Sequence, residues 1–295
     1  MIQEKDGVYE GIPGGIYHAE QMVALKDMVV SKSMLWDFFK NPKLWAKGVK
    51  KTVSSSMEFG SLVDCLTLTP EEFGDNYIIQ PETYMGPESQ KKGAPLIEKP
   101  WNNNATVCAE WGKKIPKHIS IVSAEEYKRA TRIRDSLKEH PIFGEILSSC
   151  KKQVAVYNTF NPDKYNLRGL PLRFKCLIDA LPVNNKNYDN AIVDLKTTSK
   201  IISPKQLKHV IYDFGYHVQA KSYLDAYNAV TGENRTRFIF AFVTNTDPIV
   251  VATVEVNEEM LAHGRDWMHR AVDKWTECVT TESFTTEWDT LIKLD

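Results

Sequence analysis

Cysteine is scarce in this sequence, and no two cysteines are spaced as a metal-binding or redox pair. The 295 residues include five cysteines, namely Cys65, Cys108, Cys150, Cys176 and Cys278. None belongs to a C-x-x-C motif, so the pattern predicts neither a zinc site nor a disulfide framework. We expect these cysteines to be reduced residues of the core.

Long apolar runs and an excess of one charge are also absent. No stretch approaches the roughly 18 apolar residues of a membrane-spanning helix. The start, MIQEKDGVYEGIPGG, lacks the basic segment and apolar centre of a secretory signal, so we expect a cytoplasmic protein. The formal net charge of −1 gives no general attraction to a polyanion, and nucleic-acid binding would require a local concentration of positive charge.

What is present is the composition of an ordinary globular protein, with 42% hydrophobic and 25% charged residues. Helical patterns dominate residues 1–150, apart from residues 80–118, whose Gly, Pro and Asn content predicts a long irregular loop. Strands and helices alternate in residues 151–295. No linker divides the chain, so we expect a single α/β domain, with a mixed central sheet flanked by helices and a helical N-terminal part.

The stretch AIVDLKTT at residues 191–198 is the most informative one. Its apolar start predicts a strand, and Asp194 and Lys196 then share a face because alternate residues of a strand point to the same side. The preceding strand, LRFKCLID, ends at Asp179, and a turn-rich segment joins the two. We therefore expect a hairpin that brings Asp179 beside Asp194, since neighbouring strands lie about 4.8 Å apart.

Two carboxylates at that distance repel each other unless a cation lies between them. Mg²⁺ would satisfy both, because it prefers carboxylate oxygens and completes its shell with water and substrate phosphate. Such an ion polarises a phosphodiester and lowers the pKa of an attacking water. Lys196 can orient that water or stabilise the developing negative charge. For Asp194 and Lys196 alone, the alternative is a surface ion pair at a sheet edge.

The D…D-x-K pattern of Asp179, Asp194 and Lys196 resembles the signature of the PD-(D/E)XK nucleases. The resemblance implies the PD-(D/E)XK nuclease core, with Asp179 and Asp194 as its two acids and Lys196 as its lysine. It also implies a metal site that includes Asp179, Asp194 and Leu195.

The helix expected next, from Ser203 to Val230, extends the resemblance. Its sequence YDFGYHVQAKSYLDAY places four residues at i, i+4, i+7 and i+11 on one helical face, namely Tyr212, Tyr216, Gln219 and Tyr223. An aromatic stripe is usually part of a core, but a buried glutamine amide needs partners. The stretch YHVQ is similar to one in the RecE-type (exonuclease VIII-like) exonucleases, and this similarity implies Gln219 and Tyr223 as active-site residues.

Two earlier segments are similar to the same exonucleases. Residues 17–19 and 30–33, YHA and VSKS, resemble the start of their nuclease domain. Residues 59–73, FGSLVDCLTLTPEEF, resemble a helix in which a histidine binds the metal. Asp64 stands at that histidine's position, and a carboxylate oxygen is an equally suitable Mg²⁺ ligand. The alternative for Asp64 is a solvent-facing residue of a helix.

Positive groups beside the site are candidates for holding the DNA backbone. Arg173 and Lys175 share the alternating side of Asp179 on its strand, which makes them the first candidates for phosphate contacts. Arg168 in the preceding turn, and Lys205 and Lys208 at the start of the next helix, are further candidates. A structural salt bridge explains these last three equally well.

The resemblance implies a magnesium-dependent exonuclease, in which Mn²⁺ can substitute, that degrades linear double-stranded DNA from 5′ ends and leaves 3′ tails for a single-strand-annealing protein. It also implies a ring-shaped homo-oligomer of three or four subunits, in a phage or prophage recombination system. Three alternatives remain: a single-strand or flap nuclease of the same superfamily, a catalytically inactive DNA-binding protein with the nuclease fold, and a structural α/β domain with a chance D-x-K.

Overall fold

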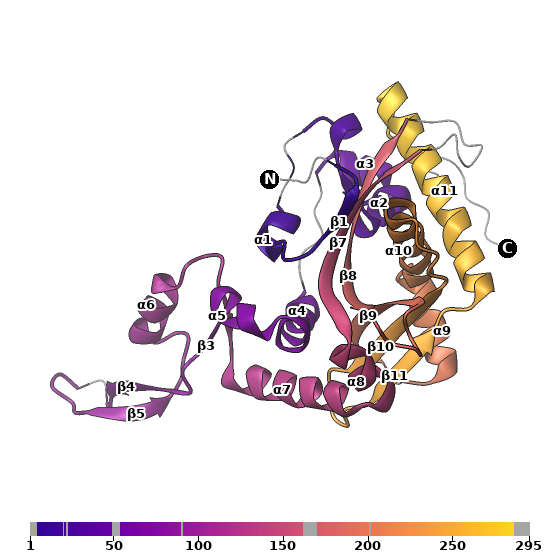
Figure 1. Ribbon diagram of the computed structural model, residues 1–295. Helices are drawn as coiled ribbons and strands as arrows, with labels where there is room; N and C mark the ends of the chain where they lie inside the picture. Colours follow the sequence, from indigo (N-terminus) through magenta and orange to yellow (C-terminus); the bar gives the residue numbers. More distant parts are fainter. Residues whose placement is uncertain are drawn as a thin grey trace. The chain divides into compact units, whose positions relative to one another are not determined.

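The computed structural model of the protein describes residues 5–19, 21, 23–48, 54–89, 91–161, 170–200 and 202–285. The chain forms two compact units (Figure 1). The sheet unit combines Met1–Val53 with Glu139–Asp295, and the inserted unit is Ser54–Lys138. The chain therefore leaves the sheet unit for the inserted unit and returns to it, a division that the sequence, with its even composition, did not predict.

A seven-stranded mixed sheet forms the centre of the sheet unit (Figure 1). Its order is β1 (Gly7–Tyr9), β7 (Cys150–Phe160), β8 (Leu172–Pro182), β9 (Ala191–Thr198), β10 (Arg237–Thr244) and β11 (Val251–Glu255), and β2 (Val30–Ser31) also pairs with β8. The pairs β9–β10 and β2–β8 are parallel, and the other pairs are antiparallel. The predicted mixed α/β fold is confirmed, and β1 and β2 are short strands that the sequence did not predict.

Burial explains why β9 and β10 lie inside the sheet. β10 reads RFIFAFVT, and its seven residues after Arg237 are all buried. A strand that is apolar on both faces needs cover on both sides and a neighbour at each edge. β9 and β11 supply those neighbours, so the acid and the lysine of AIVDLKTT lie on an interior strand rather than at a sheet edge.

Four helices of the sheet unit contribute residues to its core: α2 (Lys32–Lys40), α9 (Pro204–Asp213), α10 (Tyr216–Thr231) and α11 (Glu258–Thr281). Side chains of Ser31, Ser203 and Asn257 cap α2, α9 and α11 by accepting a backbone N–H from the first turn. The shorter helices are α1 (Gly14–Tyr17), η1 (Leu25–Asp27), α3 (Pro42–Ala46) and α8 (Pro141–Ser148). Within the described residues, no helix is both long enough and apolar enough to cross a membrane.

The single helix predicted from Ser203 to Val230 is wrong, because the chain breaks between α9 and α10. Gly215 lies in the left-handed region with φ +64°, which a continuous helix does not permit. A Cβ at Gly215 would lie 2.8 Å from the ring of Trp36, so this backbone also passes close to α2. Tyr212 consequently belongs to α9, and only Tyr216, Gln219 and Tyr223 of the predicted face lie on α10.

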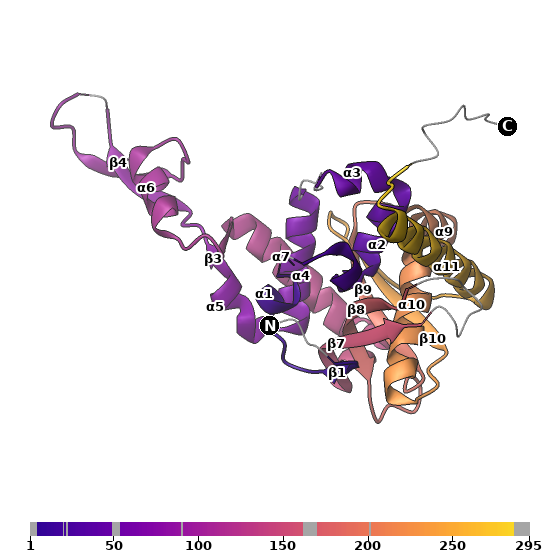
Figure 2. The same cartoon turned by 90° about the horizontal axis from the view of Figure 1, so that it is seen from above.

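The helix α10 lies between the sheet and α11 (Figure 1). Its backbone comes so close to α11 that a Cβ at Gly264 would lie 2.1 Å from the carbonyl oxygen of His217. Figure 2 shows α2 beside α11, where the rings of Trp36 and Trp267 are 5.3 Å apart. Packing on both sides therefore fixes the helix that carries Gln219.

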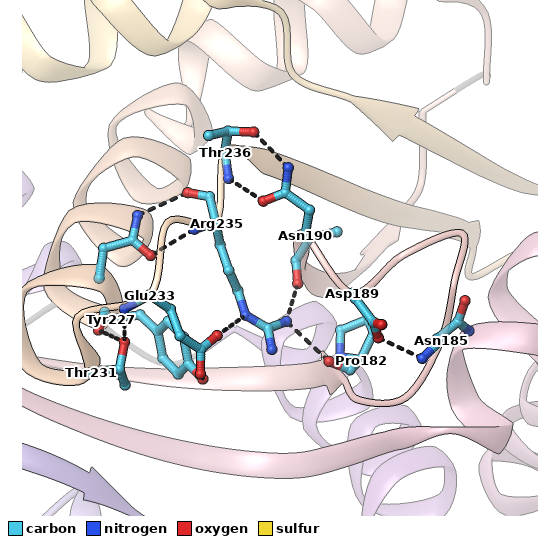
Figure 3. Close-up of polar contacts among 11 residues, drawn as sticks. Pro182, Asn185, Asp189, Asn190, Tyr227, Thr231, Glu233, Arg235 and Thr236 are labelled. Carbon is cyan, nitrogen blue, oxygen red and sulfur yellow. Dashed lines mark hydrogen bonds and ion pairs between the residues drawn. The ribbon is translucent and has the colours of Figure 1, made fainter.

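A buried arginine holds the start of β9 (Figure 3). Arg235, 7% exposed, donates hydrogen bonds to the carbonyl oxygens of Pro182, at 3.0 Å, and Ala191, at 2.8 Å. Its Nε donates to Glu233 at 3.0 Å. One side chain thus connects the end of β8, the start of β9 and the loop before β10. Its contact on β9, Ala191, lies three residues before Asp194 in the chain.

The inserted unit has its own helices and short strands. They are α4 (Ser55–Leu68), η2 (Pro70–Glu72), α5 (Phe73–Asn76), β3 (Tyr77–Ile79), β4 (Thr83–Pro87), β5 (Leu96–Pro100), α6 (Thr106–Lys114), β6 (Ser120–Val122) and α7 (Ala124–Glu139). The irregular loop predicted at residues 80–118 is therefore wrong. That segment forms the β4–β5 hairpin and α6, joined by an aromatic cluster in which Trp101 and Trp111 are 5.1 Å apart.

Candidate active site

The two acids of the D…D-x-K pattern lie on neighbouring strands. β8 and β9 pair antiparallel with Ala180 opposite Val193, and one residue further in the same register Asp179 lies opposite Asp194. The backbone N–H of Leu195 donates to Oδ2 of Asp179 at 2.8 Å. The predicted pairing of these two strands is confirmed, and it brings Asp179, Asp194 and Leu195 together.

Asp194 is buried, and both of its oxygens have partners. The side-chain amide of Gln219 donates to Oδ1 at 2.5 Å, and Lys196 forms an ion pair with Oδ2. Asp194 is 3% exposed and Gln219 is 6% exposed. A buried carboxylate is costly unless it is paired and hydrogen-bonded, and Lys196 and Gln219 supply both requirements. Strand β9 and helix α10 thus form one polar cluster that includes Gln219, whose active-site role stays a prediction.

The charge of Lys196 is set by two opposing effects. Burial lowers the pKa of its ammonium group, but the carboxylate of Asp194, together with Tyr216 and Asp179, more than offsets burial and raises the pKa above its ordinary value. The Nζ atom also lies 5.1 Å from the centre of the Tyr216 ring. Lys196 is therefore held as a cation beside the acids.

Gln153 is a site residue that the sequence did not indicate. Its side-chain amide donates to Oδ1 of Asp179 at 3.2 Å, so both oxygens of Asp179 accept a hydrogen bond. Gln153 has φ +50°, a left-handed conformation that costs a non-glycine residue about 1–2 kcal/mol. Gln153 is the fourth residue of β7, and no sequence motif marks its contact, because its partner Asp179 lies on a different strand, β8.

Tyr223 lies one turn of α10 beyond Gln219 and is partly buried. Desolvation raises the pKa of its hydroxyl well above the ordinary value, and nearby groups that include Tyr17, Asp194 and Asp179 add to the rise. Tyr223 is therefore a neutral hydroxyl near both acids. This position agrees with the site role expected for it, which stays a prediction.

The two first candidates for phosphate contacts, Lys175 and Arg173, have different environments in the structure. Lys175 is buried, donates a hydrogen bond to the carbonyl oxygen of Tyr17 and lies over the Tyr17 ring at 4.5 Å. Arg173 faces Asp6 at 4.0 Å and lies six residues, about 20 Å of strand, from Asp179. Arg173 is therefore distant from the acids, and the ammonium group of Lys175 is bonded inside the protein. The predicted phosphate contacts of both residues stay predictions.

The other basic candidates differ in what the structure says of them. Lys205 and Lys208 are exposed on α9, close in the chain to the site helix, so their predicted role is compatible with their position. Arg168 lies outside the described residues.

Asp64 lies on α4 of the inserted unit and is partly buried. Its predicted helix is confirmed, with Ser54 as N-cap through a 3.3 Å bond from the N–H of Met57. Asp64 helps to raise the pKa of the neighbouring Cys65 thiol to about 11, for which burial is the main cause. Its role as a metal ligand stays a prediction.

The donors of the sheet unit fit a hard divalent cation. Two neighbouring carboxylates, Asp179 and Asp194, offer the oxygen ligands that such ions prefer, and the carbonyl oxygen of Leu195 stays a predicted ligand. In the described part of the chain, no three or more His, Cys, Asp or Glu side chains gather at one point. Asp179 and Asp194 would hold the ion together with further oxygen ligands from the protein, water or substrate.

Comparison with known proteins agrees with this geometry. Residues 31–288 match the family described as "PDDEXK-like domain of unknown function (DUF3799)". The chain belongs to this family. The match includes the acids Asp179 and Asp194, Lys196 and Gln219, so the PD-(D/E)XK family inferred from D…D-x-K is confirmed. No curated protein matches the chain.

Two solved structures extend the comparison. A protein from Eubacterium rectale with a provisional exonuclease name has a TM-score of 0.57 and 16% identity, over 93% of this chain and 88% of that one. It shares the fold of this PDDEXK-like domain. A phage-related exonuclease from Haemophilus somnus 129PT has a TM-score of 0.31 and 13% identity, over 52% of this chain and 74% of that one. This TM-score is too low to indicate a shared fold.

Proposed function

We propose that this PDDEXK-like protein is a magnesium-dependent exodeoxyribonuclease that hydrolyses the phosphodiester bonds of linear double-stranded DNA. The observation that carries the proposal is the cluster on β8, β9 and α10, in which Gln219 and Lys196 hold the buried Asp194 beside Asp179. Membership of the PDDEXK-like family and the exonuclease name of the Eubacterium rectale protein support it.

Each residue of the cluster would have a separate role in the reaction. A bound Mg²⁺ would activate a water and polarise the scissile phosphate. Asp179 and Asp194 would hold the ion, and their hydrogen bonds from Leu195, Gln153 and Gln219 keep the oxygens in place. Lys196, which stays an ammonium group, would stabilise the negative charge that develops on the phosphate.

The polarity and partners are proposed from the resemblance to RecE-type exonucleases. The protein would digest from 5′ ends and leave 3′ single-stranded tails for a single-strand-annealing protein. A ring of three or four subunits would enclose the DNA, which would compensate for a net charge of only −1. Sedimentation with and without DNA tests the ring, and a monomer under both conditions contradicts it.

Digestion of matched DNA substrates tests the function. The substrates are a 5′-phosphorylated linear duplex, the same DNA as a closed circle, and single strands, each with Mg²⁺ or with EDTA. We expect loss of the linear duplex alone, and only with Mg²⁺. Nicking of the circle contradicts exonuclease action, a preference for single strands indicates a single-strand or flap nuclease, and survival of every substrate indicates a DNA-binding protein.

The Asp194→Asn variant ties this activity to the cluster. We expect a loss of activity of about 10²–10³-fold, because the neutral amide binds a divalent cation less strongly than a carboxylate and leaves Lys196 without its counter-charge. Asp213→Asn at the exposed end of α9 is the control and should keep wild-type activity. Equal activity in Asp194→Asn and wild type would contradict the assignment of the site.

A further inference from the structure

Lys32 is a buried lysine that the cluster of acids does not include. It is the first residue of α2, follows the N-cap Ser31, and is 7% exposed. A cation in the first turn of a helix is unfavourable, because the helix dipole is positive there. Burial adds a desolvation cost and Lys196 disfavours the charge further, whereas Asp194 and Asp37 favour it, and the unfavourable effects prevail. This net cost raises the question of what the lysine does at this position.

The contacts of Lys32 lie at the break between α9 and α10. Its Nζ atom donates a hydrogen bond to the carbonyl oxygen of Phe214 at 2.7 Å. Trp36, one turn along α2, packs against the left-handed Gly215 so closely that a Cβ there would overlap the ring. These two side chains of α2 therefore hold the two residues, Phe214 and Gly215, at which the chain turns into α10.

The break is connected to the acids by two short routes. The carbonyl oxygen of Gly215 accepts the backbone N–H of Gln219 at 3.1 Å, and the side chain of Gln219 donates to Asp194. The ring of Tyr216 lies next to both cations, 5.7 Å from Nζ of Lys32 and 5.1 Å from Nζ of Lys196. A displaced break would therefore move Gln219 and Tyr216 together, and with them the partners of Asp194 and Lys196.

We propose that Lys32 is a positioning residue, which fixes the start of α10 through the Phe214 carbonyl and thereby aligns Gln219 and Lys196 with Asp194. The proposal rests on the proposed nuclease function. Burial, reinforced by Lys196, lowers the pKa of the Lys32 ammonium to about 7, which agrees with a group kept despite its cost. A methionine would fill the same space without that cost, but it could not donate to Phe214.

The test compares Lys32→Met with Lys40→Met as matched control. Lys40 is exposed on the same helix and lies over the same Trp36 ring at 4.7 Å, but its position gives it no bond to Phe214. Single-turnover digestion of linear duplex at varied DNA concentration separates the rate at saturation from the KM. We expect a rate about 10–100-fold lower in Lys32→Met with an unchanged KM, and a rate within about twofold of wild type in Lys40→Met.

Hydrogen exchange provides a readout that does not depend on catalysis. We expect faster exchange of the amides of residues 214–219 in Lys32→Met, with unchanged exchange in α11. If the wild-type protein cleaves DNA, and Lys32→Met has the same cleavage rate and the same amide exchange as wild type, the positioning role is overturned. A wild-type protein that does not cleave DNA refutes the proposed function instead, and the exchange comparison still decides whether Lys32 holds the break. If Lys32→Met does not fold, Lys32→Gln, whose shorter side chain falls short of Phe214, decides by the same exchange measurement.

Discussion

Gln219 donates a hydrogen bond to Asp194 from 25 residues further along the chain, and this bond fastens α10 to the interior strand β9. Both groups are buried, so neither water nor a mobile side chain can replace the bond. The orientation of the Asp194 carboxylate therefore depends on the helix as much as on the strand.

Gln219→Leu removes that bond at nearly constant volume. We expect single-turnover cleavage to fall about 10–100-fold, because one oxygen of Asp194 loses the donor that orients it. Gln206→Leu on α9 is the control and should stay within about twofold of wild type. An unchanged rate in Gln219→Leu would mean that Lys196 alone orients Asp194.

Lys196→Met leaves the buried Asp194 without its cation. We expect the free energy of unfolding, measured by urea titration without metal, to fall by about 3–5 kcal/mol. Added Mg²⁺ should restore more stability to Lys196→Met than to wild type, because the ion supplies the missing positive charge. An equal effect of Mg²⁺ on both proteins would argue against a metal at Asp194.

Gly215→Ala tests the break between the helices. Its left-handed φ costs an alanine about 1 kcal/mol, and the Cβ also meets the Trp36 ring at 2.8 Å. Gly232→Ala at the end of α10 is the matched control, since Gly232 has φ +74° with open space around its Cβ position. We expect thermal unfolding to show a clearly larger loss for Gly215→Ala. Equal losses would mean that the Trp36 contact imposes no constraint.

Arg235→Met tests the anchor at the start of β9. It leaves the carbonyl oxygens of Pro182 and Ala191 without a donor, and each buried orphan costs about 1–3 kcal/mol. Arg237→Met removes a half-exposed pair with Glu255 and an exposed bond to the carbonyl oxygen of Asn187, which water can replace, and should cost about 1 kcal/mol. Urea titration measures both, and similar losses would contradict the anchoring role of Arg235.

The sequence predicted the parts of this protein that depend on local pattern. The strands around Asp179 and Asp194 follow from apolar runs bounded by turn residues, and the helix start at Ser203 was also predicted. The D-x-K spacing then placed Asp194 and Lys196 on one face of β9, and the pairing of β9 with β8 brought Asp179 beside Asp194.

The features that the sequence did not predict are set by contacts distant in the chain. The break at Gly215 depends on Trp36 of α2, and the burial of Lys175 depends on the carbonyl of Tyr17. Without Trp36, the sequence around Gly215 fits a continuous helix. Without Tyr17, Lys175 fits a lysine that faces the surface from a strand. The hairpin within residues 80–118 was not predicted, because glycines and prolines occur both in the turns of hairpins and in irregular loops.

The bond from the Leu195 N–H to Asp179 makes a backbone amide part of the acid pair. Most amides of an interior strand donate to a carbonyl oxygen, whose electron density hardly changes when a ligand arrives. This amide donates to a carboxylate instead, and its proton resonance follows the charge and position of that carboxylate. One peptide group of β9 is thus a native spectroscopic reporter for Asp179, readable by nuclear magnetic resonance without any label on DNA.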